Sequence, residues 1–379
     1  MKHRPFVWLS ALATTLCIAL SPGATAAAPA PPQPGDYIVH VENPDCAIGG
    51  PIVRVTPSGE ATILAQGGLL RKPRGSAVQD DNTLIVADGQ AGLLKLDFRT
   101  GSTSRIAFGP PWQPREVAID SDGSYIVADW PDSSAATLQA ANGLTSAASP
   151  SGRPPAQPSG PPSRASSPGG SQSSGPVAGP PAVYRITPAG KVTMIASGDP
   201  LITPHGMALD ASGNIIVTEA LPNSNGVIRV TPDGQMTVVR HFDRTFVNGA
   251  GVRVDAEGNY IVADNSGALW KVTADGGLAA IHRGSPFSSH PFQNNPNGLG
   301  GPRGVDLDSN GDAIVLDQTQ GALYRVTPGG DVSLIYQGDV LCHPANVMIY
   351  KPLPAVRVPT PTVTEPSPTD EFPESSPGE

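Results

Sequence analysis

Cysteine and aromatic residues are scarce in this sequence. Only 3 of its 379 residues are Cys, and Phe, Trp and Tyr together make up 5%. This composition excludes a small disulfide-rich scaffold. After the first 30 residues, no apolar run approaches the ~18 residues that a membrane helix needs. The sequence also lacks a phosphate loop, HExxH and GxSxG motifs and cysteine pairs with zinc spacing, so it carries no signature of a nucleophilic hydrolase.

Positive charge is also in short supply. Lys and Arg total 24 against 33 for Asp and Glu, which gives a formal net charge of -9. This balance argues against nucleic acid or an anionic membrane as the partner. The 43 Gly and 43 Pro residues approach the range of disordered proteins, but 39% hydrophobic content suffices for a packed core if those residues are unevenly distributed.

The first 26 residues are typical of a secretory signal peptide. "MKHR" supplies the positive start, "PFVWLSALATTLCIAL" the apolar run, and "ATA" a cleavage site that ends at Ala26. We therefore expect a secreted or periplasmic protein, whose mature chain begins with a Pro/Ala-rich linker at residues 27–34. Cleavage removes Cys17 and leaves Cys46 and Cys342, which in an oxidising compartment predicts one disulfide.

Two motifs alternate along the chain. The first occurs in five copies, among them "PREVAIDSDGSYIVAD" at 114–129, "PHGMALDASGNIIVTE" at 204–219 and "PRGVDLDSNGDAIVLD" at 302–317. The second, of the form "ALYRVTPGGDVSLIY", occurs in six copies. Each motif predicts a β-hairpin, because short β-branched runs flank a turn with Gly. Two hairpins per unit of roughly 42 to 46 residues give four antiparallel strands, the size of one propeller blade.

The sequence therefore predicts an all-β fold, a six-bladed β-propeller of four-stranded antiparallel blades over residues 35–351. The sixth copy of the first hairpin is split between the termini, with "PANVMIY" at 344–350 as the inner strand and "GDYIVHV" at 35–41 beside it. The C-terminal strand is thus expected to close the ring by pairing with the N-terminal blade. Cys46 and Cys342 then fall at one rim on adjacent strands, where a disulfide would add up to roughly 5 kcal/mol in the chain-entropy model.

Two segments are too poor in large apolar residues to join this core. Residues 133–181 consist mainly of Ser, Pro, Gly and Ala and interrupt blade three between its second and third strands. Residues 352–379 form an acidic Pro/Thr/Ser tail. Neither can bury enough surface to offset its ordering entropy, so both are predicted to be disordered.

The repeats resemble NHL repeats, on phrases such as "PREVAIDSDGSYIVAD" and "PRGVDLDSNGDAIVLD", and the resemblance covers roughly residues 35–351. It implies a six-bladed propeller but marks function poorly, because similar propellers include interaction domains and enzymes such as virginiamycin B lyases, α-amidating lyases and gluconolactonases. "PHG" at 204–206 followed by "TE" at 218–219 is also similar to virginiamycin B lyase blades, which carry Trp and Phe where Ile216 and Val217 stand here.

In blades two to six, the second residue of the first motif and the acid that ends it are always fourteen positions apart. The pairs are Arg74 and Asp88, Arg115 and Asp129, His205 and Glu219, Ala250 and Asp264, and Arg303 and Asp317. In an antiparallel hairpin this offset places both members at one rim on adjacent strands, which favours a structural ladder of ion pairs. The pair His205 and Glu219 has a second interpretation, because a His beside a carboxylate can act as a general base near neutral pH.

The same strand starts place a ring of cationic side chains around one mouth of the channel. Arg74, Arg115, His205 and Arg303 together suit a carboxylate or phosphate group on a small ligand or peptide. Blade five lacks the cation, and Asn248 and Asp264 form a notch there that could bind a cation or a polar ligand, unless Asp264 caps its own turn.

A segment of blade six nearly fits a calcium-binding loop. In "DLDSNGDAIVLD", residues 306–317, the candidate metal ligands are Asp306, Asp308, Asn310 and Asp312. The repeat register, however, makes this segment the turn of a β-hairpin, which favours a structural role.

The sequence thus favours an exported binding or scaffold module, expected to be a monomer, that engages a small anionic ligand, a peptide or a protein partner at the channel mouth. This interpretation requires no cofactor. The alternative is a metal-dependent propeller enzyme, a lyase or a lactonase, that uses His205 and Glu219 with a divalent cation such as Mg or Ca.

Overall fold

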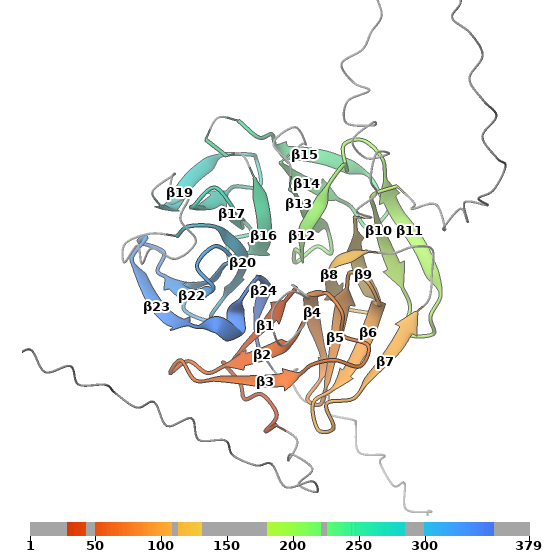
Figure 1. The fold of residues 1–379 in the computed structure, drawn as a ribbon. Helices are drawn as coiled ribbons and strands as arrows, with labels where there is room; N and C mark the ends of the chain where they lie inside the picture. The colour runs from red at the N-terminus through yellow and green to blue at the C-terminus, as the bar shows by residue number, and fades with distance from the viewer. Residues whose placement is uncertain are drawn as a thin grey trace, which may run out of the picture.

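The computed structural model describes residues 29–42, 50–107, 113–130, 180–220, 226–243, 245–246, 248–284 and 299–351. Their strands form six four-stranded antiparallel sheets, arranged as blades around a central axis (Figure 1). The predicted all-β six-bladed propeller is therefore confirmed. The signal peptide, Cys46, most of the insertion and the acidic tail lie outside the described residues, so the expectations for them remain predictions.

The first three blades run outward from an inner strand at the axis. Blade one contains β24 (Pro344–Ile349), β1 (Tyr37–Val41), β2 (Ile52–Val55) and β3 (Ala61–Ala65). Blade two contains β4 (Pro73–Asp80), β5 (Thr83–Asp88), β6 (Gly92–Asp97) and β7 (Thr103–Ala107). Blade three contains β8 (Pro114–Ile119), β9 (Tyr125–Asp129), β10 (Ala182–Ile186) and β11 (Val192–Ser197). The predicted insertion therefore does fall between the second and third strands of blade three.

The last three blades take their strands in chain order. Blade four contains β12 (Pro204–Leu209), β13 (Ile215–Glu219), β14 (Val227–Val230) and β15 (Met236–Arg240). Blade five contains β16 (Gly249–Val254), β17 (Tyr260–Asp264), β18 (Ala268–Val272) and β19 (Leu278–Arg283). Blade six contains β20 (Pro302–Leu307), β21 (Ala313–Asp317), β22 (Ala322–Val326) and β23 (Val332–Gln337). A 3-10 turn, η1 (Asp339–Leu341), leads into β24, and within the described ranges no helix is long and apolar enough to cross a membrane.

The two ends of the described chain meet in blade one, as predicted. β24 pairs antiparallel with β1, with Val39 opposite Val347, and the N–H of Gly35 donates to the carbonyl of Tyr350. Six apolar clusters each span two neighbouring blades, so every blade is packed on both sides. β24 takes part in the clusters on both sides of blade one, through Met348 on one side and Val347 and Ile349 on the other.

In blades three to six, the first hairpin turns at the glycine that its sequence predicted. Gly123 and Gly311 stand in these turns with φ of 80° and 81°, a backbone conformation that favours glycine. In blade three, Arg185 of β10 forms ion pairs with Asp120 and Asp122 of this turn. Polar contacts therefore hold this turn of blade three. The turn lies at the end of the blade opposite the start of the inner strand.

The inner strands approach one another closely around the axis. A Cβ atom built on Gly206 of β12 would lie 2.1 Å from the carbonyl oxygen of Ala250 on β16. Real side chains do not tolerate such a contact with backbone, so glycine is required at this position to let the two inner strands pack.

Gly206→Ala tests this close packing. We expect it to lower the free energy of unfolding by roughly 1–3 kcal/mol, because the methyl group forces the inner strands of blades four and five apart. The matched control is Gly329→Ala, where the nearest atom to the new Cβ is Thr327 Oγ1 at 3.7 Å. Urea unfolding of both variants decides the point, and equal stability of the two would contradict the packing argument.

Candidate functional site

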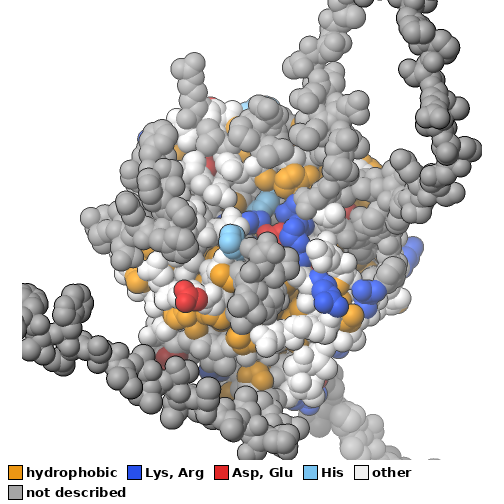
Figure 2. Space-filling view, viewed as in Figure 1, with side chains coloured by type: hydrophobic (Ala, Val, Ile, Leu, Met, Phe, Trp, Pro, Cys, Tyr) orange, Lys and Arg blue, Asp and Glu red, His pale blue; other side chains and the backbone are white. Residues whose placement is uncertain are grey.

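Four side chains from four blades meet at one mouth of the channel. Arg74 of β4, Arg115 of β8, His205 of β12 and Arg303 of β20 are each the second residue of an inner strand. They line a cavity of ≈ 270 Å³, a volume that includes its part open to solvent. Figure 2 shows Lys and Arg side chains gathered with acidic atoms and a histidine at the centre of this face. The structure thus brings together the four mouth residues that the repeat pattern predicted.

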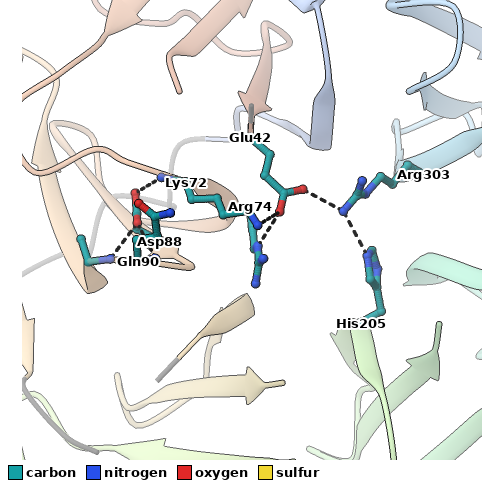
Figure 3. Close-up of polar contacts among 8 residues, drawn as sticks. Glu42, Lys72, Arg74, Asp88, Gln90, His205 and Arg303 are labelled. Carbon is teal, nitrogen blue, oxygen red and sulfur yellow. Dashed lines mark hydrogen bonds and ion pairs between the residues drawn. The ribbon is translucent and has the colours of Figure 1, made fainter. Parts of the chain in front are cut away.

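A carboxylate that the sequence analysis missed lies between these side chains. Arg74 Nε donates to Glu42 Oε1 at 2.9 Å, and Arg303 Nη2 donates to Glu42 Oε2 at 2.9 Å (Figure 3). Lys72 Nζ lies 3.1 Å from Glu42 Oε1. One buried carboxylate therefore joins cationic side chains of blades two and six.

These cations keep Glu42 ionised. Burial acts to raise the pKa of the Glu42 carboxyl, but the positive charges of Arg303, Arg74 and Lys72 outweigh it and hold this pKa well below its ordinary range. The network around Glu42 still carries more positive than negative charge, because one carboxylate faces two guanidinium groups and an ammonium group.

Register explains why the repeats did not reveal Glu42. In blade six, Asp317 at the end of the second strand pairs with Pro302 at the start of the first, whereas in blade one Val41 occupies that place opposite Pro344. Glu42 follows one residue later. A shift of one residue turns a side chain to the other side of a strand, so this acid faces the mouth instead of the preceding segment.

The acids that end the second strands cap backbone N–H groups. Glu219 Oε2 accepts from the N–H and the hydroxyl of Thr203, at 2.6 and 3.0 Å, and from the N–H of Ile202 at 3.1 Å. The acids of three other blades do the same. Asp88 accepts from the backbone N–H groups of residues 71 and 72. Asp129 accepts from the N–H of Gln113, and Asp317 accepts from the N–H of Gly300. These bonds fix the segment before the inner strand, and they give the recurring acid a structural role beside the predicted ion pairs.

The general-base pair of His205 and Glu219 stays a prediction, and the contacts of the two side chains point in different directions. Glu219 is fully buried and faces the backbone before β12, while His205 Nε2 lies 3.5 Å from Arg303 Nη2. Burial, followed by the charges of Arg303 and Arg115, holds the pKa of His205 well below its ordinary value. His205 is thus a neutral hydrogen-bonding group near pH 7 and not a fourth cation of the mouth.

The predicted notch in blade five is a capped turn. Asp264 is fully buried, its Oδ1 accepts from the N–H of Ser266 at 3.0 Å and its Oδ2 from Trp270 Nε1 at 3.1 Å. The carbonyl of Asn248 accepts from the N–H of Asn265. Neither Asn248 nor Asp264 lines the mouth cavity. The interpretation of Asp264 as the cap of its own turn is correct.

The calcium-like segment is an ion-paired turn. Arg325 Nη1 bonds to Asp308 and, at 3.0 Å, to Asp312, so a guanidinium occupies the place between the carboxylates that a cation would take. Asp306 lies apart from them, 3.3 Å from Arg253 Nε, and Asn310 contributes its N–H to Asp308. Among the residues that the structure describes, no group of three or more His, Cys, Asp or Glu side chains could hold a metal ion.

Two further polar residues that we did not predict line the mouth cavity, Glu116 of β8 and Asn346 of β24. Both occupy the third position of an inner strand, where blades two, four, five and six carry Gly. A comparison of this position across the repeats could have identified them.

Comparison with known proteins supports the fold alone. No family model matches the sequence, and no curated protein matches it. A protein of unknown function from Bacteroides caccae matches with a TM-score of 0.51 at 11% identity, over 83% of this chain and 98% of that one. A gluconolactonase from Xanthomonas campestris matches with a TM-score of 0.49 at 15% identity, over 75% of this chain and 83% of that one. Virginiamycin B lyase from Staphylococcus aureus matches with a TM-score of 0.45 at 14% sequence identity, over 79% of this chain and 73% of that one. The propeller fold that the NHL-like repeats implied is confirmed.

Glu42→Gln tests the charge network at the mouth. We expect a loss of roughly 1–3 kcal/mol at pH 7, because the substitution replaces charge-assisted hydrogen bonds with neutral ones. The folded pKa of Glu42 is depressed, so its contribution is complete above the unfolded value of about 4.5 and is lost as the pH falls through the folded value. Unfolding of the two proteins should therefore differ at neutral pH and converge in acid.

The exposed Glu60→Gln is the control and should match the parent at every pH. A difference between the parent and Glu42→Gln that stays constant from neutral to acid pH would contradict an electrostatic origin.

Proposed function

We propose that this propeller binds a small anion, a carboxylate or phosphate group of a ligand or peptide, at the mouth of its channel. The observation that supports this most directly is the convergence of Arg74, Arg115 and Arg303, from three different blades, on one cavity. Guanidinium groups bind carboxylates and phosphates through paired N–H donors, which makes such a cluster a suitable anion site.

The charge balance at the mouth favours an incoming anion. Glu42 is the ionised carboxylate of the network, against the three Arg side chains and Lys72. Asp129 and Glu116 offset only part of this charge near pH 7, because burial raises the pKa of both carboxyls to about 7. The anion would therefore enter a region of net positive potential inside a partly desolvated cavity, where attraction is stronger than in water.

Arg115 is the side chain best placed to contact the anion. Its guanidinium lies over the ring of Trp130, 4.3 Å from the ring centroid. Stacking uses the face of the guanidinium and leaves the N–H edge outside the stack, and it reduces the entropy that is lost when the side chain is fixed by a ligand. The other two arginines are held by Glu42, so the three donors are fixed before the anion arrives.

The size of the cavity limits the ligand. Sites for drug-sized molecules occupy about 300–1,000 Å³, and the enclosed space at this mouth is far smaller. A small free anion or the terminal group of a larger ligand fits such a space. The enzymatic alternative has less support, because Glu219 caps backbone and does not reach toward His205.

The proposal is tested by titrating the mature protein with sulfate, phosphate, oxalate and acetate at low ionic strength in a calorimeter. We expect at least one of them to bind, and Arg115→Gln to weaken it roughly tenfold or more, since a hydrogen bond to a charged group contributes about 1.5–3 kcal/mol. Arg185→Gln is the matched control, because it removes a guanidinium of the same blade at the turn end. Equal affinities of the two variants, or no binding of any anion, would contradict the proposal.

We further propose that the chain is exported and that Cys46 and Cys342 form a disulfide. The signal-like residues 1–26 support export, and Cys342 lies two residues before the first residue of the strand that closes the ring. The chain recovered from an exporting host should begin after Ala26 and show no thiol until it is reduced. Cys342→Ser should lose roughly 3–5 kcal/mol, because the bridge closes a very long loop. Recovery of an uncleaved chain with reactive thiols would contradict both points.

A further inference from the structure

The third position of the inner strands separates two blades from the other four. The six residues at this position are Gly75, Glu116, Gly206, Gly251, Gly304 and Asn346. Glycine is required where neighbouring inner strands touch, as at Gly206. Glu116 and Asn346 place polar side chains at a level of the channel where the other four blades have glycine and therefore no side chain. A feature present in only two repeats is not explained by the repeated architecture.

Glu116 and Asn346 contact each other across the blade that separates them. Asn346 Nδ2 of β24 donates to Glu116 Oε2 of β8. Blade two lies between their blades, and its residue at the same position is Gly75, on which a Cβ would come within 2.3 Å of Glu116 Oε1. The pair therefore fills the space that the missing side chain of Gly75 leaves. Three positions in three consecutive blades fit together to hold one carboxyl group.

This carboxyl group belongs to the mouth cavity. Glu116 is 2% exposed and lines the cavity together with Arg74, Arg115 and Arg303. An anion that those guanidiniums hold would lie beside the Glu116 carboxyl. Two negative charges in one buried site repel strongly, and a proton on one of them turns the repulsion into a hydrogen bond.

We propose that the site binds its anion together with one proton, which Glu116 takes up and then donates as a hydrogen bond to the anion. The inference rests on the anion-binding function proposed above. It adds that pH regulates this binding, because the anion binds together with H⁺. In atoms, a carboxylate oxygen of Glu116 forms an O–H bond with a proton that a hydronium ion or a protonated buffer molecule gives up. The bond of that donor to the proton breaks, and the donor is left as water or as the deprotonated buffer. Asn346 acts as a positioning residue that holds the carboxyl toward the cavity.

The burial of Glu116 already favours this proton. Burial raises the pKa of Glu116 to about 7, and Asp306 of β20 acts with burial. Arg253 of β16 and the hydrogen bonds from the N–H of Val117 and from Asn346 act in the opposite direction. Arg253 is itself paired with Asp306 at 3.3 Å, which limits its effect on Glu116. Glu116 can therefore change its charge near neutral pH, and a bound anion moves the balance further toward the protonated form.

The proton taken up by Glu116 can be told apart from protons on the other titratable groups at the mouth. Glu42 stays ionised and His205 stays neutral near pH 7, because their pKa values lie far below it. Asp129 has a pKa of about 7, so it titrates in the same range, but it does not line the cavity and accepts from the N–H of Gln113. Asp129→Asn therefore separates its contribution from that of Glu116.

The test is calorimetry of sulfate and oxalate binding to the mature chain between about pH 5.5 and 8.5, a range in which neither anion changes charge. The parent protein should bind up to roughly tenfold more weakly for each pH unit above about 7, which is the slope for one linked proton. Its binding heat should change with the ionisation enthalpy of the buffer, with a slope that reports up to one proton taken up from the buffer.

Glu116→Gln keeps the shape and the contact with Asn346 but cannot ionise. We expect its affinity to be independent of pH and of buffer, and at about pH 8 to equal or exceed that of the parent. A purely structural role of Glu116 would not produce this gain. Asp129→Asn should keep the pH dependence of the parent.

The outcomes separate the two proposals. No binding in the parent at about pH 5.5 would overturn both the anion site and the proton coupling. Binding that is independent of pH and buffer would overturn the coupling alone, and a pH dependence that persists in Glu116→Gln would overturn the role of Glu116. The proton count of the parent requires no variant, so the coupling remains testable if Glu116→Gln fails to fold.

Discussion

The close approach of the six inner strands determines what this propeller can present at its axis. Around the channel, a Cβ at Gly206, Gly251 or Gly304 would collide with backbone of the next inner strand, at 2.1, 2.8 and 2.7 Å respectively. Backbone therefore fills most of the layer below the mouth. The polar side chains that line the mouth cavity come from the second residue of the inner strands and from the two positions where the glycine is replaced.

The repeats build a frame, and the departures from them build the site. In every blade from two to six, the acid at the end of the second strand is buried. In blades two, three, four and six, this acid accepts hydrogen bonds from backbone N–H groups of the segment before the inner strand. In blade one the acid is shifted by one residue, and Glu42 binds Arg74 and Arg303 instead. The same kind of side chain thus serves as a cap or as part of a charge network, according to its register.

The sequence predicted the fold, the closure by residues 344–350 and the meeting of Arg74, Arg115, His205 and Arg303, because hairpin periodicity decides which residues share a rim. It did not predict what their side chains contact. An offset of fourteen residues brought His205 and Glu219 to one rim, but it could not show that Glu219 turns toward Thr203. Contacts between distant repeats, such as Glu116 with Asn346, depend on the channel radius and the space at Gly75, and neither is a property of a single hairpin.

The central claim is that the three arginines at the channel mouth form an anion site. A crystal structure of the mature protein soaked in selenate tests it most directly, because selenium can be located by its anomalous scattering independently of any interpretation of side chains. The account predicts an anomalous peak in the mouth cavity, with selenate oxygens within hydrogen-bonding distance of Arg115 and of Arg74 or Arg303. Selenate bound elsewhere on the surface while the mouth holds none would contradict it.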